Sequence, residues 1–480
     1  MLLRNLRISG TSGEPVDILP INGVIASVAP AGGSTLGRDF GGLWVSPGLW
    51  DNHVHFSQWA LVRQRLDVSA ASSARDTAAM VARALEGASP EPTPFVGYGF
   101  RDALWPDAPS VELLDAAAGS RPVVIVSGDL HAVWLNSAAL ALHGHAGHPT
   151  GLLREDAAFE VTHRIGTIAD EVLDRWADDA AHAAAGRGVV GIVDLEMDWN
   201  LETWSRRIAA GSRSLRVEFG VYAQHLDRAI EAGLRTGDRV NDLLTVGPFK
   251  VLTDGSLNTR TAYCYDEYPG REGAEESRGM LTVPPHELLP LLRKAVGAGL
   301  TPAVHAIGDH ANSLALDAFA ELGSGGRIEH AQLLADKDIP RFAALGVTAS
   351  VQPDHALDDR DVAEHHWAGR TDRAFALRSL LDAGAALALG SDAPVSPLDP
   401  WATAAAAVTR TRGGREPWHP EQRISTAEAL AASTRSTVAV GQPADLVLTE
   451  TDPLATDDLR SVSVAATLLA GGFTFEAGAR

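Results

Sequence analysis

Short apolar runs alternate with helical stretches through the middle of the chain. The runs are rich in β-branched residues and have the length of strands. Between two of them, residues 168–185 carry an apolar residue every fourth position, starting at Ile168 and Val172. Thr167 and Asp170 form a capping pair before this predicted helix, and Gly186 ends it. This alternation is typical of a parallel sheet covered by helices.

Eight such runs can be counted, and eight strand–helix alternations close naturally into a barrel. The predicted strands are residues 43–49, 189–195, 215–221, 244–252, 300–305, 327–330, 346–351 and 385–390. We therefore predict an α/β fold, a (β/α)8 TIM-like barrel. Barrels of this kind place their chemistry at the carboxyl ends of the strands.

Both ends of the chain lack a helical period and contain short strand-like runs, at residues 2–8, 23–28, 445–448, 462–469 and 472–475. We predict that residues 1–46 and 436–480 pair in one small β-sandwich domain, built from both chain ends, and that residues 47–435 form the barrel. The long excursion at about residues 56–167 is predicted to be an insertion over the barrel mouth.

Composition and charge narrow the range of partners. With 45% hydrophobic and 21% charged residues, the chain is globular and not disordered. The net charge of −21 repels phosphate backbones and anionic headgroups, so we expect no nucleic acid and no membrane partner, and a small-molecule substrate instead. No apolar run reaches the roughly 18 residues of a transmembrane helix. The sequence leaves the oligomeric state open, a homodimer included.

The cysteine content and the first residues point to the cellular compartment. Cys264 is the only cysteine, so no intrachain disulfide can form. The first ten residues have neither the apolar stretch nor the cleavage site of a signal peptide. A cytoplasmic protein is therefore expected.

Two histidines follow the first apolar run in the segment Asp51-Asn52-His53-Val54-His55. In an extended chain, residues two apart point to the same side, so the two imidazoles converge. Imidazole is a common zinc ligand, although a chain with 17 histidines can contain such a pair by chance.

Four later runs also carry polar residues, at Lys250, His305, His330 and Asp392. Each has an ordinary structural alternative: a salt-bridged lysine, a histidine satisfied in the core or a loop, or an aspartate that caps a helix. An ammonium flanked by apolar residues, as at Lys250, is costly unless it is paired or modified. Because these residues close separate strands of one predicted barrel, together they predict a metal centre.

The order His-x-His, Lys, His, His, Asp resembles the amidohydrolase superfamily of metal-dependent hydrolases. Longer segments are similar to its amidohydrolase family 3 branch: VSPGLWDNHVHF, FKVLTDGSLNTRTA, VHAIGDHA, RIEHAQ, SVQPDH, LALGSDAPVSPLDP and GQPADLVL. The resemblance covers nearly the whole chain. Asn258 and Thr259 depart from it, since many relatives carry smaller residues there, and the insertion is short for the branch. The first departure bears on substrate fit more than on metal binding.

The resemblance implies four imidazole ligands to Zn²⁺ or a similar divalent ion, at His53, His55, His305 and His330. One or two ions are compatible with it, and Mn²⁺ and Fe²⁺ are alternatives to zinc. It also implies that Lys250 is carboxylated and bridges two metals, and that Asp392 is both a metal ligand and the general base. Coordination chemistry agrees, because imidazole and carboxylate suit zinc.

Further residues are candidates for contact with the substrate. His131 lies in a D-x-H-x-x-W-x-N-S-x-A-L segment that matches the branch, and we expect it to hydrogen-bond the substrate carbonyl oxygen in catalysis. Its alternative role is to hold the insertion in place. Arg260, His355 and Trp105 are candidate substrate-binding residues, with ion pairing or core packing as the ordinary alternatives.

The predicted function is that of a metal-dependent amidohydrolase, which cleaves a carbon–nitrogen bond of an amide or formamide other than a peptide bond. Hydrolysis of esters or cyclic amides, or a metal-assisted lyase reaction, is the alternative on the same barrel. A non-catalytic binding barrel is disfavoured, because all six predicted ligand positions are filled.

Overall fold

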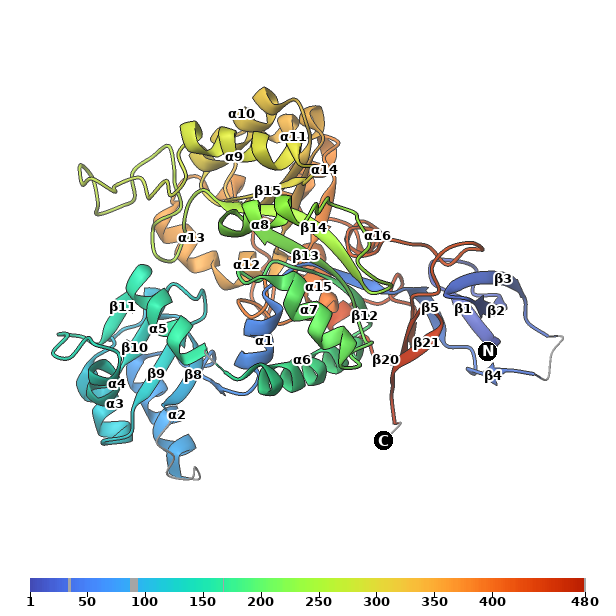
Figure 1. The fold of residues 1–480 in the computed structure, drawn as a ribbon, viewed down its shortest axis with the longest axis horizontal. Helices are drawn as coiled ribbons and strands as arrows, with labels where there is room; N and C mark the ends of the chain where they lie inside the picture. The colour runs from blue at the N-terminus through green and yellow to red at the C-terminus, as the bar shows by residue number, and fades with distance from the viewer. Residues whose placement is uncertain (33–35, 87–93, 167, 479–480) are drawn as a thin grey trace. The chain divides into compact units, whose positions relative to one another are not determined.

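The computed structural model describes residues 1–32, 36–86, 94–166 and 168–478. The chain divides into two compact units (Figure 1). One comprises Met1–Phe56 and Asp178–Arg480, and the other is Ser57–Ala177.

An eight-stranded parallel sheet forms the centre of the larger unit (Figure 1). Its strands, in spatial and chain order, are β6 (Leu49–Val54), β12 (Val189–Asp194), β13 (Arg216–Tyr222), β14 (Leu244–Leu252), β15 (Pro302–Ala306), β16 (Gly326–His330), β17 (Val347–Val351) and β18 (Leu387–Leu389). Every residue of β6 and β12 is buried, as expected for a parallel sheet covered on both faces.

Helices connect these strands along the chain. They are α6 (Asp170–Ala185), α7 (Asn200–Ala209), α8 (Leu226–Glu231), α9 (Pro285–Gly297), α10 (Asp309–Leu322), α11 (Ile339–Leu345), α12 (Pro353–Asp358), α13 (Arg360–His366), α14 (Leu377–Asp382), α15 (Pro400–Thr409) and α16 (Thr426–Ala431). Helix α6 ends directly before Gly186, as predicted, whereas Thr167 of its predicted cap lies outside the described residues. Ser425 and Glu428 form a capping box at the start of α16.

The sheet closes where its first strand meets the segment after its last. Val54 and Ala393 form a parallel bridge. The amide of Asp392 donates to the carbonyl of His53 at 2.7 Å, and the amide of His55 donates to the carbonyl of Ala393 at 2.8 Å. These contacts, which we call the barrel seam, confirm the predicted TIM-like barrel.

The predicted position of the first barrel strand, residues 43–49, is wrong. Trp44–Pro47 is β5, which pairs with a strand from each end of the chain, and the barrel strand β6 begins at Leu49. Asp51 and His53 follow the predicted apolar run in the sequence, yet they lie inside β6 and are buried. The inner wall of this barrel is therefore polar at the carboxyl end of its first strand.

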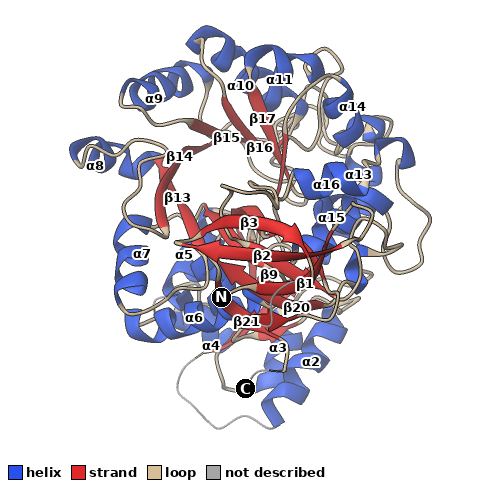
Figure 2. Cartoon of the chain, turned by 90° about the vertical axis from the view of Figure 1, so that its right-hand side faces the viewer, coloured by secondary structure: helices blue, strands red, loops and turns tan. Residues whose placement is uncertain are grey.

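Strands from both chain ends pair in one mixed sheet of the same unit (Figure 2). They are β1 (Leu3–Ile8), β2 (Pro15–Ile21), β3 (Val24–Pro30), β4 (Arg38–Asp39), β5, β19 (Leu446–Thr449), β20 (Val464–Leu469) and β21 (Gly472–Glu476). Leu3 and Ile18 from the amino end share one apolar cluster with Leu446 and Leu468 from the carboxyl end. The described strands form a single sheet, and a β-sandwich stays a prediction.

The smaller unit contains a five-stranded sheet, ordered β11-β10-β9-β8-β7. Its elements are α1 (Phe56–Val62), β7 (Leu66–Asp67), α2 (Ala74–Glu86), β8 (Phe95–Phe100), α3 (Val111–Ala118), β9 (Val123–Ser127), β10 (Ala132–Leu135), α4 (Ser137–Leu142), β11 (Leu152–Arg154) and α5 (Asp156–Gly166). Val124 and Val126 of β9 join one apolar cluster, while Val123 and Ile125 join another. Successive side chains of a strand alternate between faces, so this sheet is covered on both. Its predicted position over the barrel mouth stays a prediction.

Among the helices in the described part of the chain, none is both long enough and apolar enough to cross a membrane.

The barrel seam generates a stability prediction at Gly390. A Cβ there would lie 2.6 Å from the backbone nitrogen of His53 and 3.0 Å from a carboxylate oxygen of Asp51. We expect Gly390→Ala to lower the free energy of unfolding by about 1–3 kcal/mol, because the seam must open to make room. Gly297→Ala is the matched control, since a Cβ at this helical position meets nothing within 4 Å. Urea unfolding followed by circular dichroism measures both, and equal stability of the two variants would contradict the prediction.

Candidate metal centre

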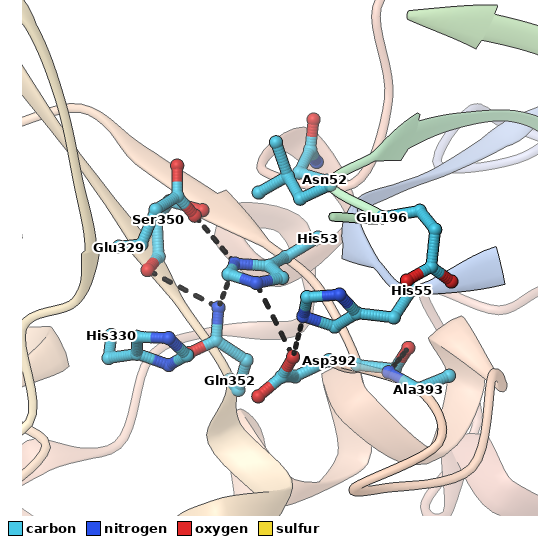
Figure 3. Close-up of polar contacts among 12 residues, drawn as sticks. Asn52, His53, His55, Glu196, Glu329, His330, Ser350, Gln352, Asp392 and Ala393 are labelled. Carbon is cyan, nitrogen blue, oxygen red and sulfur yellow. Dashed lines mark hydrogen bonds and ion pairs between the residues drawn. The ribbon is translucent and has the colours of Figure 1, made fainter. Parts of the chain in front are cut away.

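Three buried side chains converge at the barrel seam. His53, His330 and Asp392 each offer one ligand atom, and these atoms lie within 4.8 Å of one another. His53 Nε2 is 3.3 Å from Asp392 Oδ1, and the rings of His53 and His330 are 4.9 Å apart (Figure 3). Two imidazole nitrogens and one carboxylate oxygen form a donor set that suits zinc and related divalent ions. The residues present therefore fit a metal ion.

The backbone at two of these residues is strained. His330 at the end of β16 has φ 76°, and Asp392 has φ 59°. Left-handed conformations of this kind cost on the order of 1–3 kcal/mol each and persist only where the surrounding structure holds them. Asp392 is held by its amide hydrogen bond to His53. The strained backbone conformations thus occur at two of the three residues whose side chains converge.

Two polar side chains hold the histidines from behind. His53 Nδ1 lies 2.7 Å from Glu329 Oε2, and His330 Nδ1 lies 2.9 Å from Gln352 Oε1 (Figure 3). The amide nitrogen of Gln352 lies 3.4 Å from the carbonyl of Ser350 and 3.4 Å from His53 Nδ1, which leaves its oxygen for His330. Because the nearer neighbour of each Nδ1 is an acceptor oxygen, that nitrogen carries the proton and each Nε2 keeps its lone pair for a metal.

Glu329 and Gln352 are functional residues that the sequence reasoning missed. Both lie in motifs that were noted, RIEHAQ and SVQPDH, and Glu329 directly precedes a predicted ligand. Burial acts to raise the pKa of Glu329, but Arg327 and His53 outweigh it and hold the pKa well below its usual value. Glu329 is therefore a carboxylate, which is the form that accepts from His53.

The three convergent groups are in the protonation states that metal binding requires. Burial, together with the charge of Lys250, lowers the pKa of His53 to about 4. Burial and the neighbouring His305 hold the pKa of His330 well below its usual value. Burial acts to raise the pKa of Asp392, but the surrounding imidazoles outweigh it and hold the pKa well below 3.8. At neutral pH the site thus has neutral imidazoles and an ionised carboxylate.

His55 and His305 also lie beside the three convergent side chains. His55 Nε2 is 3.3 Å from Asp392 Oδ1, and the rings of His305 and His330 are 4.5 Å apart. Burial acts to lower the pKa of His55, but Asp392 and Glu196 outweigh it and raise the pKa. Glu196, which follows β12 and lies beside His55 in Figure 3, is a further site residue that the sequence reasoning missed.

Lys250 lies inside β14 and is fully buried. Burial lowers the pKa of its amine to about 8, although Glu329 and Asp392 act in the opposite direction. A buried amine with a lowered pKa is an unusually reactive lysine.

The predicted substrate-binding residues have different surroundings. His355, at the start of α12, is buried with its Nε2 3.8 Å from Asp392 Oδ2. Arg260 has φ 60° and its charge acts on His366 of α13. Trp105 belongs to the smaller unit, where it packs against the apolar cluster that contains Phe100.

His131 also lies in the smaller unit, directly before β10. Its Nδ1 is 2.9 Å from Glu155 Oε2, and its amide donates to Asp129 Oδ1 at 3.1 Å. The ring of Phe159 is 5.4 Å from the imidazole. Glu155 was not singled out from the sequence, because it is 24 residues away along the chain.

Comparisons with known proteins identify the family of the chain. A model described as the Amidohydrolase family matches residues 38–475. Protein LONG AFTER FAR-RED 3 of Arabidopsis thaliana is 30% identical over 84% of this chain and 75% of its own length. N-substituted formamide deformylase of Arthrobacter pascens is 25% identical over 91% of this chain and 89% of its own.

A solved structure shares the fold. It is described as an uncharacterized metal-dependent hydrolase from Pyrococcus horikoshii OT3, with a TM-score of 0.79 and 24% identity. The match covers 96% of this chain and 99% of that one. The barrel and the nearly full-length family match lead to one conclusion: the chain belongs to the amidohydrolase family, and is a hydrolytic enzyme of its metal-dependent kind.

Proposed function

We propose that the protein hydrolyses the carbon–nitrogen bond of a small amide or formamide at the barrel seam. The observation that carries this proposal is the convergence of His53, His330 and Asp392, buried and in metal-binding protonation states. Such a constellation is costly unless it serves a ligand, because it places these three polar groups in a water-poor interior.

The proposed ligands are the six residues singled out from the sequence: His53, His55, Lys250, His305, His330 and Asp392. Zinc is the proposed ion, with Mn²⁺ and Fe²⁺ as alternatives, and one or two ions as the stoichiometry. When bound, the metal supplies a Lewis acid that polarises the scissile carbonyl and acidifies water. The buried amine of Lys250, with its lowered pKa, favours carboxylation, which would make it a bridging carboxylate.

Asp392 is proposed as the general base. Its ionised carboxylate accepts a proton from the attacking water while the new carbon–oxygen bond forms. The same proton then passes to the substrate nitrogen, the carbon–nitrogen bond breaks, and an acid and an amine leave. The acid thus receives the hydroxyl group of water, and the amine receives the remaining proton.

For the substrate we propose a neutral N-acyl or N-formyl amine with an apolar N-substituent. Similarity to N-substituted formamide deformylase supports this class, and the net charge of −21 argues against a highly anionic substrate. Trp105 is proposed to contact the apolar group and His131 the carbonyl oxygen, with Arg260 as a further substrate contact. Trp134 and Trp367 are fully buried in apolar cores, so their role is packing.

The function is tested first at Asp392. We expect Asp392→Asn to remain folded and to lower kcat by about 10³-fold, because the amide cannot take the proton from water. Steady-state hydrolysis of N-benzylformamide by zinc-loaded protein measures this effect. Asp382→Asn, an exposed position on α14, is the matched control. Native turnover in the Asp392 variant would reject the general-base role.

Glu329 generates a prediction about metal affinity. Replacing it with Gln removes the charge that holds His53 Nδ1–H, so we expect zinc affinity to fall by about 10–100-fold. Competition between the protein and a zinc chelator measures the affinity without any substrate. Glu321→Gln, at an exposed position on α10, should bind zinc like the native protein. Unchanged affinity in a folded Glu329 variant would contradict the role of this contact.

The substrate class is tested with a series of N-substituted formamides. We expect kcat/KM to rise as the substituent grows from methyl to benzyl, because each buried methylene contributes about 0.8 kcal/mol. The series is assayed on metal-loaded protein together with esters and cyclic amides. A flat dependence would reject the apolar pocket, and activity confined to esters or charged cyclic amides would reject the substrate class.

A further inference from the structure

His355 faces the second oxygen of the proposed general base. Asp392 Oδ1 lies 3.3 Å from both His53 and His55, whereas Oδ2 lies 3.8 Å from His355 Nε2. His355 is 5% exposed, and its Nε2 has no hydrogen-bond partner among the described residues. A buried ring nitrogen aimed at a carboxylate, yet too far away to bond it, is a polar group in need of a ligand.

The neighbour of His355 Nδ1 is of the opposite kind to those of the metal-site histidines. The nearer neighbour of His53 Nδ1 is Glu329 Oε2 at 2.7 Å, with the amide nitrogen of Gln352 farther away at 3.4 Å, and Gln352 presents its oxygen to His330. At His355 the amide nitrogen of Gln332 lies 3.3 Å from Nδ1. An amide nitrogen only donates, so Nδ1 of His355 must accept. The proton of this ring is therefore on Nε2, the nitrogen that faces Asp392.

We propose that His355 positions the attacking water together with Asp392, with Gln332 fixing its tautomer. A donor nitrogen and an acceptor oxygen 3.8 Å apart can be bridged by a single group that accepts from one and donates to the other, and water is such a group. This inference rests on the proposed hydrolytic function. It gives His355 a role in turnover and makes it neither a metal ligand nor a cation for a substrate anion.

The proton inventory of the step is simple. The water oxygen accepts a hydrogen bond from Nε2–H of His355, and the water donates one of its own protons in a hydrogen bond to Asp392 Oδ2. As the carbon–oxygen bond forms, that proton moves to Asp392 and later to the departing nitrogen. His355 keeps its proton throughout, so it orients the water without exchanging a proton with it.

Two substitutions of His355 distinguish the effect of losing its hydrogen bond to water from the effect of losing the imidazole ring. His355→Leu removes the donor, and we expect kcat for N-benzylformamide to fall about 10²-fold with KM nearly unchanged. His355→Gln keeps a donor near the same place and should recover at least tenfold of that loss. Zinc content, measured by elemental analysis, should match the native protein in both variants.

Gln332→Glu tests the tautomer. A carboxylate accepts from Nδ1–H, so the ring should move its proton away from Nε2 and kcat should again fall about 10²-fold. Gln422→Glu is the matched control, because Gln422 is equally buried but hydrogen-bonds Ser379 in another part of the unit. This control reports the effect of burying a carboxylate as such, and should keep native kcat.

The tautomer is also read directly, without turnover. In protein labelled with ¹⁵N-histidine and loaded with zinc, long-range ¹H–¹⁵N spectra distinguish a protonated from an unprotonated ring nitrogen, and the His355→Gln spectrum identifies the signal. We expect a protonated Nε2 in the native protein and a protonated Nδ1 in Gln332→Glu. A native ring protonated on Nδ1, or on both nitrogens, would overturn the inference.

The kinetic outcomes are equally decisive. A rise of KM alone in His355→Leu would assign the residue to substrate binding, and a loss of zinc would assign it to the metal; either result overturns the water-positioning role. If the native protein binds zinc but hydrolyses no amide, the proposed function fails, while the spectra still decide the tautomer of His355.

Discussion

The hydrogen bond from the Asp392 amide to the His53 carbonyl is the contact on which the site depends, because it joins the first barrel strand to the segment after the last. A (β/α)8 sheet has a working interior only when it is closed, and here closure brings together residues more than 330 positions apart in the chain, as the bond from Ser391 to Asp51 also does. The close approach of His53 and Asp392 follows from strand pairing. Small changes in that pairing would move both groups at once.

The polar neighbour of each histidine Nδ1 determines whether Nε2 of that ring can bind a metal or donate a hydrogen bond. All imidazoles have the same two nitrogens, and only the neighbour of one determines what the other can do. Oxygens behind His53 and His330 prepare lone pairs for a cation, whereas a nitrogen behind His355 prepares a donor. One barrel end can therefore hold several histidines with distinct roles. This division depends on side chains of β16, β17 and the turns that follow them.

Much of this fold follows from residue patterning. The run at residues 244–252 coincides with β14, and the histidines of the later strands were recognised because each closes an apolar run. The first strand was misplaced because its inward-facing polar residues interrupt the apolar pattern that marks the other strands. Its neighbour β5, separated only by Gly48, lies inside the predicted run but belongs to the mixed sheet.

The residues that hydrogen-bond the metal-site histidines could not be predicted from residue patterning. Glu329 and Gln352 act on rings contributed by other strands, and their roles arise only when the sheet closes. The family resemblance supplied what spacing alone could not, namely the grouping of single histidines into one ligand set. The tautomer of each ring depends on contacts between strands, and no pattern along the chain encodes it directly.

The mixed sheet has a consequence for how the protein is made. Pro47 pairs with Leu446, and Gly48 alone separates that strand from the barrel strand carrying His53. Contacts between such distant segments slow folding, since the loop between them must be closed before they form. On the ribosome, β5 waits unpaired on this side until β19 has been synthesised. During that interval one edge of β5 is unpaired, and unpaired strand edges are the surfaces through which incompletely folded chains associate.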